Sequence, residues 1–219
     1  MWPPNLGRTP VTAPNARARG QLFVISAPSG AGKTSLVHAL IERDSALSVS
    51  VSHTTRVRRE GERDGVEYNF VDRATFEQLV DEGRFLEHAE VFGNLYGTSA
   101  DWVEAALAGG QDLILEIDWQ GARQIRARYA DVHDVFILPP DFETLKARLT
   151  GRGQDAPEVI TRRLSEACTD VSHHAEFRYL VVNDAFEVAC DDLLAIVRAA
   201  RLECAGQRQR HHDALEGLR

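Results

Sequence analysis

The sequence is poor in lysine. Only two of its 25 basic residues are lysines, Lys33 and Lys146, and the others are arginines. The 33 acidic residues outnumber the basic ones, which gives a formal net charge of -8 at pH 7. A nucleic-acid coat needs a broad positive face, so this composition argues against nucleic acid as a partner. A small anionic ligand remains compatible with it, because a local group of arginines can hold one phosphate on an acidic protein.

Cysteines and long apolar runs are also scarce. Cys168, Cys190 and Cys204 are widely spaced and form no C-x-x-C pair, so they predict neither a disulfide framework nor a zinc site. Unpaired thiols are typical of the cytoplasm. No apolar run approaches the ~20 residues of a membrane-spanning helix, and the N-terminus has no apolar secretion signal. We therefore expect a cytoplasmic protein without a membrane segment or a membrane partner.

The first 20 residues differ from the rest of the chain. They hold four of the eight prolines, three arginines and no acidic residue, and they show no apolar periodicity. This composition predicts a disordered extension over residues 1–20. The remaining chain, residues 21–219, has the length of a single domain.

Short apolar runs alternate with helical patterns in the remaining chain. The runs span residues 22–26, 113–118, 135–138 and 179–183, and helical patterns follow at 33–43, 119–128, 141–149 and towards the C-terminus. This alternation predicts an α/β fold, in which a parallel sheet carries helices on both faces.

Two stretches break the alternation. Residues 49–98 combine strand patterns at 49–55 and 67–71 with a helical pattern at 73–82, which predicts a small mixed α/β lobe. Residues 149–175 begin with a Gly-Arg-Gly loop and continue with a helical pattern. We call the first of these two stretches the lobe.

The strongest local signal is the segment APSGAGKT at residues 27–34. It fits the phosphate-loop pattern G-x-x-x-x-G-K-[ST], except that Ala27 replaces the first glycine, and it has the required strand before it and helix after it. Gly30 and Gly32 allow backbone N–H groups to point at phosphate oxygens. Lys33 can reach the β- and γ-phosphates, and the Thr34 hydroxyl can ligate Mg²⁺. The predicted ATP-binding residues of this loop are Ala27, Pro28, Ser29, Gly30, Ala31, Gly32, Lys33 and Thr34.

Two acidic residues close the apolar run at 113–118. Glu116 and Asp118 flank Ile117, its last apolar residue. Ligand sites in open parallel sheets lie at the carboxyl ends of the strands, so these carboxylates are expected near the phosphate loop. Acids in this position can hold Mg²⁺ or its water ligands.

With these motifs the chain resembles guanylate kinase, a nucleoside-monophosphate kinase, and the bacterial enzyme in particular. The resemblance runs from about residue 20 to the C-terminus. Its carriers are APSGAGKT, S-x-T-T-R-x-x-R-x-G-E at 52–62, YGT at 96–98, LEIDWQG at 115–121, GRG at 151–153 and VND at 182–184. It implies a P-loop parallel-sheet core (residues 21–48, 99–148 and 176–219), a GMP-binding lobe (49–98) and a helical lid (149–175). The implied reaction is transfer of the ATP γ-phosphoryl group to GMP.

The lobe residues fit a monophosphate site. Arg56 and Arg59 are three positions apart, and two guanidinium forks with the phenol of Tyr68, joined by Tyr96, make a suitable cage for a phosphate.

The resemblance also implies how guanine is recognised. Glu87 occupies the family position whose carboxylate pairs with the two guanine donors, with Ser52 and Thr98 beside it, and Asp118 lies near the acceptor nucleotide. A polar pocket of this kind rejects the wrong base, because its own groups would be left unpaired. The implied GMP-binding set is Ser52, Arg56, Arg59, Tyr68, Glu87, Tyr96, Gly97, Thr98 and Asp118.

The lid arginines complete the implied catalytic set. Positioned cations supply most of the catalysis of phosphoryl transfer, because charge is spread over three oxygens. By resemblance, Asn183 borders adenine. Glu116 stands where many family members have aspartate, so its extra methylene favours Mg²⁺ contact through a water, beside direct contact from Thr34. The implied catalytic residues are Lys33, Arg56, Arg148, Arg152 and Arg163, with Arg162 a neighbour able to replace Arg163.

Three alternatives stay open at this point. Another nucleoside-monophosphate kinase would differ at the base pocket. A non-catalytic guanylate-kinase-like binding module would lose phosphate-loop residues, whereas Lys33 and Thr34 are present. A regulatory GTPase would need further guanine-reading motifs after the central strands. Bacterial relatives are often oligomers, so the resemblance also leaves a homo-oligomer open.

Overall fold

The structure is a computed structural model that describes residues 19–151 and 157–218, apart from the side chains of residues 157–159. The predicted extension up to residue 18 and the predicted lid residue Arg152 lie outside the described residues. No helix within the described ranges is both long and apolar enough to cross a membrane.

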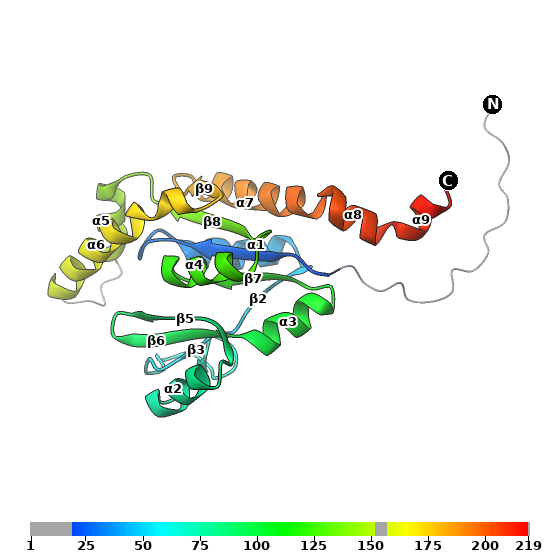
Figure 1. The fold of residues 1–219 in the computed structure, drawn as a ribbon. Coiled ribbons are helices and arrows are strands. Elements are labelled where there is room, and N and C mark those ends of the chain that lie inside the picture. The colour runs from blue at the N-terminus through cyan, green and yellow to red at the C-terminus, as the bar shows by residue number, and fades with distance from the viewer. Residues whose placement is uncertain (1–18, 152–156, 219) are drawn as a thin grey trace.

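A five-stranded parallel sheet forms the centre of the fold (Figure 1). In spatial order its strands are β2 (Leu47–Val49), β7 (Asp112–Glu116), β1 (Leu22–Ser26), β8 (His133–Leu138) and β9 (Tyr179–Val182). All five residues of β1 are buried, because the strand has a neighbour on each side and helices on each face, which explains its unbroken apolar run. The predicted α/β fold with a parallel-sheet core is confirmed.

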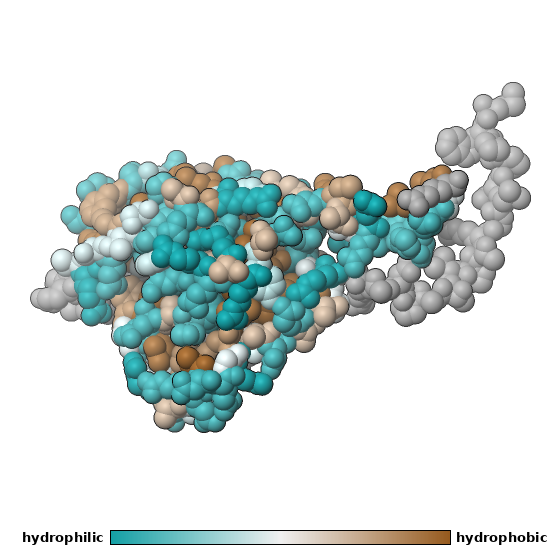
Figure 2. Space-filling view, in the orientation of Figure 1, coloured by the Kyte–Doolittle hydropathy of each residue, from teal (hydrophilic) through white to brown (hydrophobic). Residues whose placement is uncertain are grey.

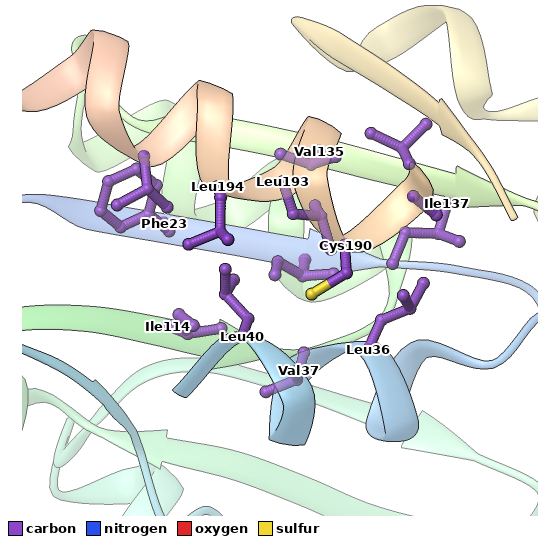
Figure 3. Packing of buried hydrophobic residues seen from close by; sticks show 14 of the residues in the cluster. Phe23, Leu36, Val37, Leu40, Ile114, Val135, Ile137, Cys190, Leu193 and Leu194 are labelled. Atoms are coloured by element: carbon purple, nitrogen blue, oxygen red, sulfur yellow. The ribbon is translucent and has the colours of Figure 1, made fainter. Parts of the chain in front are cut away.

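Helices cover both faces of this sheet. The helices α1 (Lys33–Arg43) and α7 (Phe186–Arg201) pack on one face, and α3 (Ala100–Ala108) and α4 (Trp119–Arg128) pack on the other. Figure 3 shows the first face, where Leu36 and Leu40 of α1 lie opposite Leu193 and Leu194 of α7, next to the central strands. Burial of these side chains supplies the main apolar stabilisation of the fold.

Aspartate side chains fix the start of three helices. Asp72 accepts a hydrogen bond from a backbone N–H of α2 (Arg73–Asp81), Asp118 does so for α4, and Asp141 for α5 (Phe142–Thr150). An N-cap of this kind satisfies one of the backbone donors that a helix leaves unpaired at its start. The cap at Asp118 also anchors a predicted site residue at the edge of the sheet.

The lobe has its own four-stranded sheet. Its spatial order is β4 (Asn69–Phe70), β3 (His53–Thr54), β6 (Asn94–Ser99) and β5 (Phe85–Val91). Helix α2 packs on it through Phe76, which is fully buried and lies 4.6 Å from the Phe85 ring, centroid to centroid. The small mixed α/β lobe expected from the sequence is therefore present.

One expected strand, residues 49–55, is wrong as a single element. Val49 ends β2 and pairs with Ile114 in the large sheet, whereas His53 and Thr54 form β3 in the small sheet. The chain crosses between the two sheets over residues 50–52, so the same β-rich sequence serves two layers. The long β5–β6 hairpin and α3 were not expected from the sequence.

The lid is helical, as expected, and it packs on the core through α5. Helix α6 (Pro157–Ser172) places Ala167 and Leu164 against Leu145 and Leu149, and the short 3₁₀ helix η1 (His174–Glu176) leads from it to β9.

Two helices that the sequence did not predict, α8 (Cys204–Arg210) and α9 (His212–Glu216), extend beyond the sheet at the C-terminus (Figure 1). Hydrophilic residues predominate on the face drawn in Figure 2.

Candidate active site

A pocket of about 440 Å³ opens at the carboxyl end of the large sheet. One wall is the loop between β1 and α1, and a second is the first turn of α4. The remaining walls are the end of β5 and the inner face of α6. The pocket therefore lies where the phosphate loop, the lobe and the lid meet.

The loop between β1 and α1 has the backbone that its glycines predict. Gly30 and Gly32 have φ angles of 89° and 93°, in the left-handed region that favours glycine. Asn183, which is buried, donates an amide hydrogen to the Ala31 carbonyl at 2.8 Å. A Cβ on Gly32 would lie 2.5 Å from the Asn183 amide nitrogen. Asn183 thus supports the loop through the Ala31 carbonyl. Its predicted place beside adenine stays a prediction.

Lys33 and Thr34 extend from the loop towards β7. The Lys33 ammonium donates to the Ile117 carbonyl at 3.0 Å, and the Thr34 hydroxyl donates to the Glu116 carboxylate at 2.5 Å. The parallel pairing of Ile25 with Glu116 explains this approach, because it brings the ends of β1 and β7 to the same edge. The two residues predicted to hold a metal are therefore in contact.

Glu87 is buried within the lobe, with 3% of its surface exposed. It accepts a hydrogen bond of 2.5 Å from the Thr98 hydroxyl, which lies 3.3 Å from the Ser52 hydroxyl. Burial raises the pKa of the Glu87 carboxyl to about 7, and the nearby charge of Asp118 adds to the rise. The three residues predicted to read guanine thus form one connected polar group.

The core helix α4 lies directly against this polar group. Gln124 of α4 exchanges two hydrogen bonds with the backbone of His88, at 2.7 and 3.2 Å, which fixes β5 on the helix. Asp118 accepts from the Gly121 N–H at 2.9 Å and lines the pocket. A Cβ on Gly121 would lie 2.4 Å from a carboxylate oxygen of Glu87, so only glycine fits there without a shift.

The predicted phosphate cage is partly assembled. The Arg56 guanidinium lies 5.3 Å from the centre of the Tyr68 ring, and the Tyr96 ring centre is 5.8 Å from that of Tyr68. Arg56 is also paired with Glu62, whose carboxylate accepts from the backbone N–H of Arg59 at 2.8 Å. The Arg59 side chain is exposed on this loop.

Two of the predicted catalytic arginines, Arg148 on α5 and Arg163 on α6, contact residues at or next to the pocket. Arg148 donates to the Asn183 carbonyl at 3.0 Å, and its other terminal nitrogen is buried without a hydrogen-bond partner among the described residues. Arg163 lies on α6, beside Phe92 of the lobe. An unsatisfied buried guanidinium nitrogen is an available donor for an anionic ligand.

Gly97 has a packing role in the structure. A Cβ at this position would lie 3.0 Å from both Phe76 and Phe85, so its lack of a side chain lets the lobe core close. Its predicted contact with GMP stays a prediction.

Asp170 is a pocket residue that the sequence did not predict. This acid on α6 lines the pocket, and burial raises the pKa of its carboxyl to about 6, with the Asp118 charge adding to the rise. Next to it, His173 stacks on Trp119 with ring centres 3.6 Å apart, which joins the end of α6 to the start of α4. No sequence signal marked Asp170, because it is one acid among several on an amphipathic helix.

The chain is similar to known proteins both in sequence and in fold. The sequence model of the family described as "Guanylate kinase" matches residues 19–200. Guanylate kinase from Alkalilimnicola ehrlichii is 63% identical over 182 residues, covering 83% of this chain and 90% of that protein. The enzyme from Hahella chejuensis is 55% identical over 201 residues, covering 92% and 97%. The crystal structure of guanylate kinase from Anaplasma phagocytophilum superposes with a TM-score of 0.74 at 33% identity, covering 91% of this chain and 97% of that one.

Proposed function

The chain belongs to the guanylate kinase family and is an ATP:GMP phosphotransferase, and we propose that it holds ATP on the loop of residues 27–34 and GMP in the lobe. The reaction is ATP + GMP → ADP + GDP, which returns GMP to the purine nucleotide pool. The first turn of α4 carries this assignment of the two sites. Lys33 donates to the Ile117 carbonyl just before this turn, and the buried Glu87, bonded to Thr98, lies against Gly121 within it.

The donor site is built for phosphates. Backbone N–H groups of the loop and the N-terminal end of α1 face the triphosphate. Lys33 then leaves its contact with the Ile117 carbonyl, or shares it, to meet the β- and γ-phosphates. Ala27, Pro28, Ser29, Gly30 and Gly32 line the pocket and form the cradle together with the buried Ala31, and Asn183 holds it in shape.

The acceptor site reads the base and the phosphate separately. The Glu87 carboxylate pairs with the N1–H and the 2-amino group of guanine, while Thr98 and Ser52 meet its O6 side. Arg56, Arg59, Tyr68 and Tyr96 hold the monophosphate. Asp118 and the Gly97 backbone complete the nucleotide contacts.

The chemical step needs positioned charge more than proton transfer. The acceptor is a phosphate oxygen that is already ionised near neutral pH, so no general base is assigned. In this proposal Lys33, Arg56, Arg148, Arg152 and Arg163 stabilise the spread charge of the transferred phosphoryl group. The open donor of Arg148 supports its part in this set. Closing the lid also excludes water, which would otherwise consume ATP.

The residues at the end of β7 suit a magnesium ion. A threonine hydroxyl and a carboxylate are hard oxygen ligands, and here they lie within 2.5 Å of each other beside the loop. Thr34 would hold the ion directly and Glu116 through a water. Bound there with ATP, Mg²⁺ would neutralise part of the phosphate charge.

Both substrates are nucleotides of the cytoplasm, and we place the enzyme there. Its partners in this proposal are ATP and GMP, without nucleic acid or membrane. A homo-oligomer is compatible with the resemblance.

The test is a coupled assay of ADP production from ATP with GMP, AMP, UMP or CMP as acceptor. We expect turnover with GMP well above the others, and loss of turnover in Lys33→Ala. A preference for AMP would contradict the base-pocket assignment, and equal turnover by Lys33→Ala would contradict the phosphate-loop assignment. Titration of Mg²⁺ against Glu116→Gln tests the metal site, with a raised Mg²⁺ requirement expected.

A further inference from the structure

The turn that joins β5 to β6 carries an unexpected residue. The loop consists of Phe92 and Gly93, with φ angles of 53° and 79°, between the paired residues Val91 and Asn94. Two-residue hairpin loops with both φ angles positive favour Asn-Gly, Asp-Gly or Gly-Gly. A bulky side chain in the left-handed region is a conformational outlier with an energetic cost. Hairpin formation alone does not explain phenylalanine at this position.

The Phe92 side chain faces the lid. It lines the pocket and keeps 36% of its surface exposed. The guanidinium carbons of Arg162 and Arg163, on α6, lie 5.9 and 5.8 Å from the centre of its ring. Arg162 also approaches Glu166, another pocket residue, at 3.8 Å.

This contact joins parts of the chain that are far apart in sequence. Figure 1 shows the β5–β6 hairpin below the large sheet and α6 coming down towards it from above. The Phe92 ring meets α6 at this place, where the lobe and the lid both border the pocket. A cation is attracted to the face of an aromatic ring within about 6 Å of its centre.

We infer that Phe92 is a positioning residue, which holds the lid arginines Arg162 and Arg163 at the mouth of the pocket through its ring face. This inference rests on the proposed role of Arg163 towards the transferred phosphoryl group. A guanidinium that is already placed by the ring needs less ordering when the nucleotides bind. Because the ring belongs to the lobe that receives GMP, it also ties the place of the lid arginines to the position of that lobe.

The substitution Phe92→Asn separates this role from a structural one. Asn-Gly is a preferred sequence for this turn, so the melting temperature should rise or stay equal. The kcat should fall about threefold to thirtyfold, the range expected for loss of a cation–π contact. A merely structural residue would lose activity and stability together. An unchanged kcat in this variant would overturn the inference.

Two further variants at the same position test the ring itself. Phe92→Tyr keeps an aromatic face and should keep kcat, whereas Phe92→Leu keeps an apolar side chain and should lose kcat as Phe92→Asn does. Full activity of Phe92→Leu would show that the ring face is unnecessary and would overturn the inference. Trp102→Asn is the control, since Trp102 is an exposed aromatic on α3 outside the pocket lining, and its kcat should not change.

Double-mutant cycles identify the partner. The three backgrounds are Arg162→Ala, Arg163→Ala and the variant with both changes. In at least one of them, Phe92→Asn should have little further effect on kcat. Independent effects in all three backgrounds would overturn the inference. Failure of the proposed role of Arg163 is distinguishable, because Arg163→Ala, alone or together with Arg162→Ala, would then leave kcat unchanged. Loss of kcat in these variants together with a fully active Phe92→Asn enzyme would leave the proposed function intact and reject only the role of Phe92.

Discussion

Arg56 donates hydrogen bonds from both terminal nitrogens of its guanidinium to the carboxylate of Glu62, at 2.7 and 3.1 Å. Both side chains are largely withdrawn from solvent, with 13% and 17% of their surfaces exposed. The contact holds the pKa of Glu62 below its usual range. Because Glu62 also binds the backbone N–H of Arg59, one carboxylate orders the loop that carries both predicted phosphate-binding arginines.

We therefore predict that Glu62→Ala weakens GMP binding. The arginines would lose their common anchor, and KM for GMP should rise about tenfold, or roughly 1.4 kcal/mol, as expected for loss of a charge-assisted hydrogen bond. Steady-state kinetics with GMP varied at saturating ATP would measure it. Glu62→Gln keeps an acceptor for the Arg59 N–H, so its KM for GMP should lie between that of the wild type and that of Glu62→Ala. A lower KM in Glu62→Ala would mean that Glu62 competes with the phosphate for Arg56.

The pH dependence of GMP use should report Glu87. Its carboxylate must be ionised to accept from both guanine donors, and its pKa is raised to about 7 by burial. We expect kcat/KM for GMP to fall as the pH drops below about 7, with a second contribution from the phosphate of GMP near pH 6. In Glu87→Gln the kcat/KM should be low at every pH. Its remaining pH dependence should come only from the phosphate of GMP. An identical pH profile in that variant would rule out this role for Glu87.

The same pKa shift predicts a change in stability with pH. The folded state binds a proton at Glu87 more tightly than the unfolded state, whose pKa is 4.5. Stability therefore decreases as the pH rises between these two pKa values, from about 4.5 to about 7, because the unfolded state releases its proton first. The free energy of unfolding, measured with urea, should fall more between pH 5 and pH 8 for the native chain than for Glu87→Gln. Equal losses would mean that Glu87 is not desolvated.

Gly121→Ala should disturb guanine recognition from the core side. The new Cβ would lie 2.4 Å from an oxygen of Glu87, so the carboxylate must move. We predict that KM for GMP rises about tenfold or more while KM for ATP changes little, since a misplaced polar group leaves its partner unpaired. The shorter side chain of Glu87→Asp should relieve the contact, so the double variant should be better than the product of the two single effects.

A matched glycine provides the control for that prediction. Gly206 lies on α8, and among the described residues a Cβ there would meet the Gln21 amide alone, at 3.6 Å, which is an ordinary contact. Gly206→Ala should therefore leave both KM values unchanged. If the Gly121→Ala enzyme also kept its KM for GMP, the close approach of α4 to Glu87 would have no bearing on specificity.

Asn183→Ala should affect ATP more than GMP. The change removes the hydrogen bond that supports the Ala31 carbonyl under the phosphate loop. Loss of a buried hydrogen bond costs about 1–3 kcal/mol, and we expect a lower melting temperature and a KM for ATP raised several-fold. Asn69→Ala is the counterpart in the lobe, where the amide donates to the Val51 carbonyl at 3.1 Å. It should raise KM for GMP instead, and a reversed pattern would contradict the division of the two sites.

Much of the core could be predicted because the signals for its strands and for the phosphate loop lie within short stretches of sequence. The unbroken apolar run of β1 and the glycines of the following loop are read from neighbouring residues, and β1 and the left-handed glycines are present in the structure. Residues 49–55 were harder, since a short β-rich segment contains no information about which of two sheets each residue joins. The lobe hairpin was missed because its turn has phenylalanine in place of the usual asparagine.

The sequence by itself determined the α/β class, the phosphate loop and the family, because these depend on periodicity and on the spacing of motif residues. Only the tertiary structure decided that Glu87 is buried against α4, that Asn183 supports the loop and that Phe92 meets the lid. These are contacts between residues 34 to 152 positions apart, and they arise from how the two sheets and the helices pack. Spacing along a chain identifies chemical groups, whereas burial and contact between distant segments set the pKa of a carboxylate and the place of an arginine.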